Sequence, residues 1–125
     1  MKPRLAITMG DPAGVGAEVC IKTLQRLAVF EQAQPFVVGS VACLAQAMAQ
    51  ADIDLPMRRI ESIDGLIETN VIQVLEPLAF DIEQLVMGQV SARCGDAAVQ
   101  YFETAVRLAL AGEIQAIVTC PINKE

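Results

Sequence analysis

The chain has 125 residues, a formal net charge of -6 and a hydrophobic fraction of 54%. Its length accommodates one modest domain, and its apolar content is too high for an intrinsically disordered protein. The acidic balance and an aromatic fraction of only 4% exclude nucleic acid and anionic membrane surfaces as partners, because these need basic patches or stacking side chains. We expect a cytoplasmic protein with a small-molecule or protein partner.

The first half of the chain alternates short apolar runs with amphipathic segments. Residues 5–9 predict a buried strand that ends at a glycine-rich turn. The helix expected to follow from Val15 has its apolar stripe at Val19, Cys20, Leu24, Leu27 and Ala28. Residues 35–39 predict a second strand, and Ser40 is expected to cap a helix that continues to about Ala51.

The second half gives weaker signals before residue 91. Residues 57–60 and 71–75 are short strand candidates between glycine, proline and acidic residues. A helix is expected after a cap at Ser91, with Gly112 as its stop. Its predicted apolar stripe is Ala98, Phe102, Ala105, Val106 and Ala109. Residues 114–119 predict a last strand, so the whole pattern indicates an α/β fold with helices layered on the faces of a largely parallel, buried sheet.

The residue types restrict the chemistry that the chain can support. Histidine is absent, which excludes histidine-based catalysis within these residues, and we predict no metal site among them. The four cysteines form no CxxC pair and are expected to be reduced thiols that pack in the core: Cys20, Cys43, Cys94 and Cys120. No membrane span is expected, because the longest uncharged stretch, residues 32–51, contains proline and glycine.

The first candidate for ligand binding is the segment from Gly10 to Gly16, which links a predicted strand to a helix. Such a loop offers backbone N–H groups and a helix N-terminus to a ligand. Its spacing matches neither GxGxxG nor GxxxxGK[ST]. Asp11 and Glu18 could accept hydrogen bonds from a ribose or bind a cation through oxygen. The structural alternative is a tight turn followed by a Glu18 that stabilises the helix dipole.

The second candidate is the segment 119–124, at the predicted carboxyl end of the last strand. Asn123 and Lys124 could contact a substrate there, because ligands bind at this edge of parallel sheets. A solvated lysine near the end of the chain explains the same residues without any function.

Three blocks together resemble a known family: residues 7–18 (ITMGDPAGVGAE), 88–92 (GQVSA) and 116–124 (AIVTCPINK). The sequence resembles the 4-hydroxythreonine-4-phosphate dehydrogenases of pyridoxal phosphate (vitamin B6) biosynthesis and their paralogues. The resemblance implies a fold like that of isocitrate and isopropylmalate dehydrogenases, a homodimer, and the use of NAD with a divalent metal held by histidines. Those histidines lie outside this chain, so residues 1–125 are expected to be the truncated N-terminal α/β portion of a longer enzyme, inactive alone.

The implied reaction is oxidation of 4-hydroxythreonine 4-phosphate by hydride transfer to NAD, followed by loss of carbon dioxide. Within this resemblance, Asn123 and Lys124 are expected to act at the substrate. The residues expected to shape the cofactor-side loop are Gly10, Asp11, Gly14 and Gly16. The alternatives are a paralogue acting on threonate or erythronate 4-phosphate or on an aromatic dihydrodiol, and a non-catalytic binding or assembly module.

Overall fold

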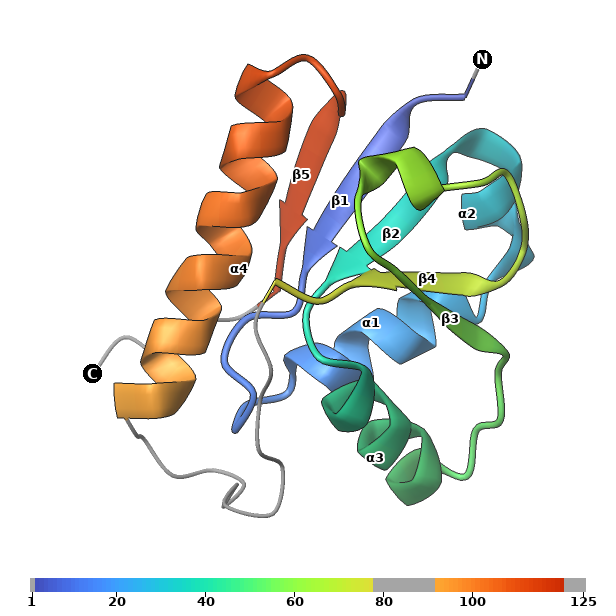
Figure 1. Ribbon diagram of the computed structural model, residues 1–125. Coiled ribbons are helices and arrows are strands. Elements are labelled where there is room, and N and C mark those ends of the chain that lie inside the picture. The colour runs from blue at the N-terminus through green and yellow to red at the C-terminus, as the bar shows by residue number, and fades with distance from the viewer. Residues whose placement is uncertain (1, 78–91, 121–125) are drawn as a thin grey trace.

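The structure, a computed structural model, describes residues 2–77 and 92–120 (Figure 1). One five-stranded sheet runs through it, and every strand pair in the sheet is parallel. The strands lie in the order β3 (Met57–Ile60), β4 (Ile72–Leu75), β2 (Gln34–Val38), β1 (Arg4–Thr8) and β5 (Ala116–Thr119). The predicted parallel α/β fold is therefore confirmed.

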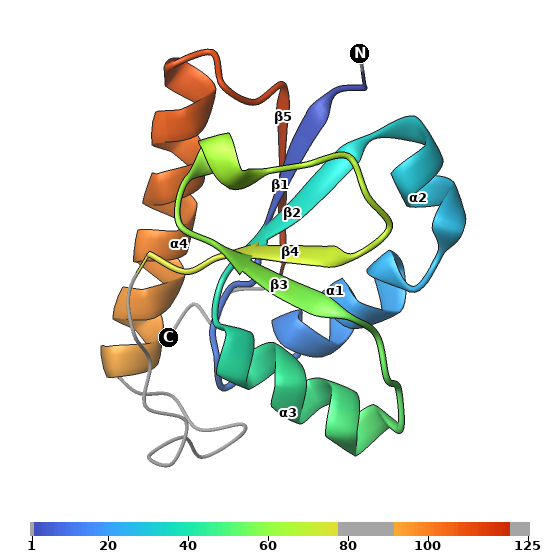
Figure 2. The same ribbon diagram turned by 45° about the vertical axis from the view of Figure 1, so that its right-hand side comes forward.

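The helices cover both faces of this sheet (Figures 1 and 2). They are α1 (Gly16–Leu24), α2 (Leu27–Gln32), α3 (Val41–Ala51) and α4 (Ala92–Leu110), with a short 3-10 turn, η1, at Ile63–Gly65. The connection through α4 runs from β4 to β5, opposite in direction to the step from β1 to β2 through α1 and α2. Because parallel crossovers are right-handed, α4 packs on one face and α1 to α3 lie on the other.

The core is aliphatic and is centred on β1, β2 and β4. All four residues of β4 are buried, as are Phe36 to Val38 of β2. Gln73, the buried polar residue of β4, has hydrogen-bond partners for both ends of its side-chain amide. Its Oε1 accepts from the Ile67 N–H at 2.9 Å and its Nε2 donates to the Ile67 carbonyl at 2.8 Å. These bonds hold the β3–β4 connection against the sheet, since a buried amide without partners would be costly.

The structure confirms the two predicted helix signals that it describes. Ser40 lies at the N-cap of α3, where its Oγ accepts from the Cys43 N–H at 3.2 Å. Gly112 has a φ of 76° after the end of α4, the left-handed conformation that favours glycine. The predicted cap Ser91 lies outside the described residues.

The helix predicted from Val15 was wrong in its extent and partly wrong in its face, although Cys20 and Leu24 are buried as predicted. It ends at Leu24, and the extended backbone of Arg26 separates it from α2. Val19 and Ala28 are exposed, and Ile21 takes the buried position that the prediction gave to Val19. The side chain of Leu27 lies outside the described part of the structure.

The predicted burial near the end of the chain was also partly wrong. Ala98 and Ala105 of α4 are buried as expected, but Phe102 is exposed and Tyr101 occupies the core instead. β5 is the outermost strand of the described sheet, and three of its four residues are exposed. Its apolar sequence predicted burial, but the described residues provide no further strand or helix to cover its outer side.

Candidate active site at the carboxyl edge of the sheet

Both candidate segments begin at the same place in the fold. The glycine-rich loop leaves the carboxyl end of β1, and Cys120 leaves the carboxyl end of the neighbouring strand β5. Open α/β sheets bind ligands in the crevice outside the carboxyl ends of their strands. The fold thus brings Cys120, from the start of the second segment, beside Gly16 of the first, although about a hundred residues separate them in sequence.

Asp11 organises the loop internally. It is almost completely buried; its Oδ1 accepts from the Ala13 N–H at 2.8 Å and its backbone carbonyl accepts from the Gly14 N–H at 2.9 Å. Side-chain bonds of this kind, two residues ahead, define an Asx turn. One carboxylate oxygen of Asp11 is therefore committed to the backbone of the loop.

Glycine is required at two positions of this loop for different reasons. Gly10 has a φ of 78°, in the left-handed region. A Cβ at Gly16 would lie 1.7 Å from the Met9 carbonyl oxygen and 3.3 Å from the Cys120 Cβ. The first turn of α1 therefore rests directly on the ends of β1 and β5, an approach that a side chain at Gly16 would prevent.

A pocket of about 190 Å³ lies between the loop and α3. The loop and α1 contribute Pro12, Gly14 and Glu18 to its lining, and α3 contributes Gln46 and Gln50. Glu18 also accepts from the Lys22 Nζ at 2.7 Å, a pair four residues apart on α1. Of the four predicted cofactor residues, Gly14 lines this pocket, whereas the other three are buried: Gly10, Asp11 and Gly16.

The pocket beside the glycine-rich loop does not by itself accommodate NAD, and the described residues gather no metal-binding cluster. The pocket is smaller than the about 300 to 1,000 Å³ of typical ligand pockets, and a dinucleotide would extend beyond it. Within residues 2–77 and 92–120, no group of three or more His, Cys, Asp or Glu side chains is placed to hold a metal. The predicted substrate residues Asn123 and Lys124 lie outside the described residues.

Cys20 of α1 and Cys120 meet at the junction of the two candidate segments. Their Sγ atoms are 3.6 Å apart and both side chains are buried. The hydrogen bond between the thiols and the burial of Cys20 raise the pKa of Cys20, whereas the same hydrogen bond lowers the pKa of Cys120. Sequence analysis missed this pair because only the tertiary fold brings the two residues together.

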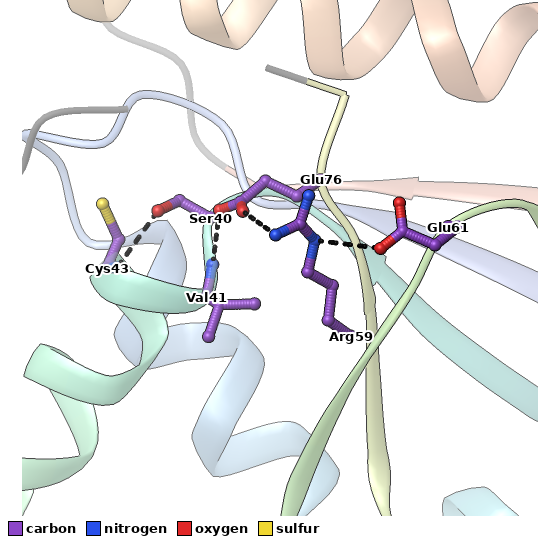
Figure 3. Close-up of polar contacts among 6 residues, drawn as sticks. All are labelled: Ser40, Val41, Cys43, Arg59, Glu61 and Glu76. Carbon is purple, nitrogen blue, oxygen red and sulfur yellow. Dashed lines mark hydrogen bonds and ion pairs between the residues drawn. The ribbon is translucent and has the colours of Figure 1, made fainter. Parts of the chain in front are cut away.

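A polar cluster occupies the same edge of the sheet at β2, β3 and β4 (Figure 3). Glu76, directly after β4, accepts from the Val41 N–H at 3.0 Å and lies 3.9 Å from a guanidinium nitrogen of Arg59. Arg59 also lies 3.8 Å from a carboxylate oxygen of Glu61. Glu76 thus places a negative charge at the N-terminus of α3, a stabilising arrangement. The available signal for Glu76 was its position directly after an apolar run.

The comparisons with known proteins identify the family. Residues 31–125 match the family model described as "Pyridoxal phosphate biosynthetic protein PdxA". The chain belongs to the PdxA family. Among solved structures, this PdxA chain is similar to a 4-hydroxythreonine-4-phosphate dehydrogenase from Burkholderia phymatum, with a TM-score of 0.91 and 40% identity over 99% of this chain and 38% of that one.

Two further relatives of this PdxA chain carry different substrate names. A protein of Clostridium botulinum, named "Putative D-threonate 4-phosphate dehydrogenase", is 37% identical over 99% of this chain and 37% of its own length. The structure of a terephthalate 1,2-cis-dihydrodiol dehydrogenase from Burkholderia xenovorans has a TM-score of 0.76 at 26% identity, over 99% of this chain and 35% of that one. The chain thus spans a little over a third of the length of these relatives. Among its described residues, no helix is long and apolar enough to cross a membrane.

Proposed function

We propose that the complete protein is a dehydrogenase of a small phosphorylated hydroxy acid, and that residues 1–125 form its N-terminal α/β portion. The observation that carries this proposal is the similarity of the whole chain to a 4-hydroxythreonine-4-phosphate dehydrogenase, at a TM-score of 0.91. The meeting of the glycine-rich loop and the end of β5 at the carboxyl edge supports it, because this is where α/β enzymes bind their ligands.

The proposed substrate is 4-hydroxythreonine 4-phosphate, and D-threonate 4-phosphate is the second candidate. The family description and the B. phymatum structure favour the first, whereas the name of the C. botulinum relative favours the second. The two molecules share a carboxylate, an oxidisable C3 alcohol and a phosphate. They differ at C2, where the first carries an ammonium group, a donor only, and the second a hydroxyl, which also accepts.

The proposal includes NAD as the hydride acceptor, a divalent metal and a homodimer. Because the described residues supply no metal cluster and the pocket beside the glycine-rich loop is too small for a dinucleotide, most of the groups that bind both would come from other parts of the protein or from its partner. Gly14 and the loop around Asp11 would form one wall of the cofactor side. Asn123 and Lys124 would contact the substrate.

The test is NADH formation by the intact protein, followed by absorbance. It is given 4-hydroxythreonine 4-phosphate, D-threonate 4-phosphate or D-erythronate 4-phosphate, with and without a chelator. Chelator-sensitive turnover of one of these substrates supports a metal-dependent dehydrogenase, and the substrate with the highest kcat/KM selects between the candidates. Absence of turnover together with absence of NAD binding by calorimetry would instead support a non-catalytic module.

The assay also tests the role of Lys124. Lys124→Ala is expected to lower kcat/KM, because a cation near a phosphorylated anion stabilises its binding. Lys2→Ala is the matched control: Lys2 precedes β1 at the opposite edge of the sheet, where its Nζ pairs with Glu68 at 3.0 Å. Equal kcat/KM values for the two variants would remove Lys124 from the site.

A further inference from the structure

We propose that Cys20 and Cys120 form a redox modification site, at which a peroxide converts the two thiols to an intramolecular disulfide. The bond would tie α1 to the carboxyl end of β5, directly beside the glycine-rich loop. This inference concerns the chemistry of the two thiols and does not depend on the identity of the substrate.

The geometry already holds the two sulfur atoms in contact. They are 3.6 Å apart, and a disulfide bond is about 2.05 Å long, so closure requires the sulfurs to approach by about 1.5 Å. The backbone on both sides is held in place: the Cys120 N–H donates to the Thr8 carbonyl at 3.1 Å, and Cys20 lies in the middle of α1. The absence of a side chain at Gly16 allows this helix to lie against Cys120, since a Cβ there would be 3.3 Å from the Cys120 Cβ.

The two thiols differ in a way that assigns them separate roles. Cys120 is 6% exposed and Cys20 is fully buried, so an oxidant reaches Cys120 first. The hydrogen bond from Cys20 lowers the pKa of Cys120, which favours the thiolate, the reactive form of cysteine. Cys120 is therefore the attacking thiol, and Cys20 is the resolving thiol.

The reaction balances with hydrogen peroxide as the oxidant. The Cys120 thiolate attacks one peroxide oxygen, the O–O bond breaks, and hydroxide leaves as Cys120 becomes a sulfenic acid. The Cys20 sulfur then attacks the sulfenic sulfur, the S–O bond breaks, and the hydroxyl leaves as water with the Cys20 proton. Two cysteine sulfurs are oxidised by two electrons in total, and one peroxide is reduced to two waters.

Cys43 provides an internal comparison. Burial raises the pKa of the Cys43 thiol, which disfavours its thiolate. Cys43 lies in α3, and its backbone N–H bonds to the Ser40 cap. We therefore expect Cys43 to react with peroxide more slowly than Cys120.

Tryptic mapping of the intact protein after treatment with hydrogen peroxide tests the proposal. Trypsin places each of the four cysteines of this chain in a separate peptide: 5–22 holds Cys20, 27–58 holds Cys43, 94–107 holds Cys94 and 108–124 holds Cys120. The expected result is a peptide 5–22 linked to peptide 108–124, lighter than their sum by two hydrogen atoms. It accompanies the loss of two of these four free thiols and disappears after reduction.

Two variants make the assignment specific. In Cys20→Ala the sulfenic acid of Cys120 has no resolving thiol, so dimedone is expected to label peptide 108–124 more strongly than in the wild-type protein. Cys43→Ala is the matched control and should form the same cross-link as the wild type. The proposal is overturned if the wild-type protein keeps all four thiols, if 27–58 links to 94–107 instead, or if the 5–22 to 108–124 link is absent while other cysteines are oxidised.

Discussion

At the scale of single residues, Gly16 has no space for a side chain, whereas Tyr101 has space for its ring but no partner for its hydroxyl among the described residues. Gly16 lies where the end of β1, the start of α1 and Cys120 meet, and the space for a side chain is already filled by the Met9 carbonyl. Tyr101 of α4 is fully buried, but its hydroxyl has no hydrogen-bond partner in the described part of the chain. Close packing therefore requires glycine at position 16, whereas the buried hydroxyl of Tyr101 is an unsatisfied polar group among the described residues.

Replacing Gly16 is therefore expected to destabilise the protein. Gly16→Ala places a methyl group on the Met9 carbonyl and should lower the free energy of unfolding by at least about 1 to 3 kcal/mol, as overpacking does. Gly95→Ala in α4 is the matched control. A Cβ there meets nothing within 4 Å, and alanine in place of helical glycine should stabilise by about 0.5 to 1 kcal/mol. Urea unfolding of both variants checks the opposite signs, and a stable Gly16→Ala protein would contradict the geometry.

Tyr101 makes stability depend on pH under alkaline conditions. Burial raises the pKa of Tyr101, so the folded protein keeps the phenol protonated where the unfolded chain ionises it. This contribution is fully present below about pH 10, the unfolded pKa, and is lost as the pH rises beyond it. Tyr101→Phe should remove this alkaline loss and, because an unpaired buried hydroxyl is costly, stabilise the protein by about 1 kcal/mol at neutral pH. Thermal melts from neutral to alkaline pH compare the two proteins; equal alkaline losses would contradict the prediction.

At the scale of elements, α3 is held at its start by two acceptors from different parts of the chain. The N-cap residue Ser40 accepts from the Cys43 N–H through its Oγ. Glu76, directly after β4, accepts from the Val41 N–H through its carboxylate (Figure 3). Together they satisfy two of the N–H groups that a helix leaves without partners at its N-terminus. The cap therefore joins α3 to the central sheet.

Removing the serine cap should weaken this junction by a measurable amount. Ser40→Ala leaves the Cys43 N–H without its acceptor and should cost about 1 kcal/mol of unfolding free energy, within the range of 0.5 to 2 kcal/mol typical for such caps. Ser62→Ala is the control, because Ser62 is exposed and its side chain makes no cap hydrogen bond at η1. Chemical denaturation should separate the two variants; equal midpoints would show that Ser40 contributes nothing as a cap.

The elements also show how far the sequence could lead. The alternation of apolar runs and capped helices was sufficient to predict a parallel α/β sheet and the loop after β1. The buried faces of the helices were harder to predict. In α1, Val19 and Ile21 are both apolar and lie two positions apart, and in α4 the neighbours Tyr101 and Phe102 are both aromatic. Packing against the sheet decides which residue of each pair is buried. The contact of Cys20 with Cys120 depends on the strand order, which no local pattern encodes.

At the scale of the whole molecule, apolar surface collects on β5 and on the outer side of α4. Val118 of β5 is 46% exposed, and α4 exposes Val99, Phe102 and Leu110. The α4 residues recur at steps of a helical stripe, which is typical of a surface that another element or chain covers. The relatives have nearly three times the length of this chain, so they possess ample sequence for that purpose.

The 125-residue chain on its own is therefore expected to self-associate as its concentration rises. Val118→Lys places a charge on the outermost strand of the described sheet and should reduce this association, since lysine on an edge strand opposes edge-to-edge pairing. Ile67→Lys is matched in exposure at 50% but lies in the β3–β4 connection, so it should leave association unchanged. Sedimentation velocity over a range of concentrations measures both, and an equal effect of the two lysines would point to net charge rather than to the edge.

The pairing of β1 with β5 also means that β1 is synthesised well before its partner strand. The Arg4 N–H donates to the Gln115 Oε1, and the Gln115 N–H donates to the Arg4 carbonyl. These two residues are 111 positions apart in the sequence. At translation rates of about 5 to 20 residues per second, β1 leaves the ribosome roughly 6 to 22 s before its partner. During that interval one edge of β1 has no strand to pair with, and the loop after β1 lacks its contact with Cys120. β5 and Cys120, made after β1 and its loop, therefore complete the edge of the sheet at which the candidate site lies.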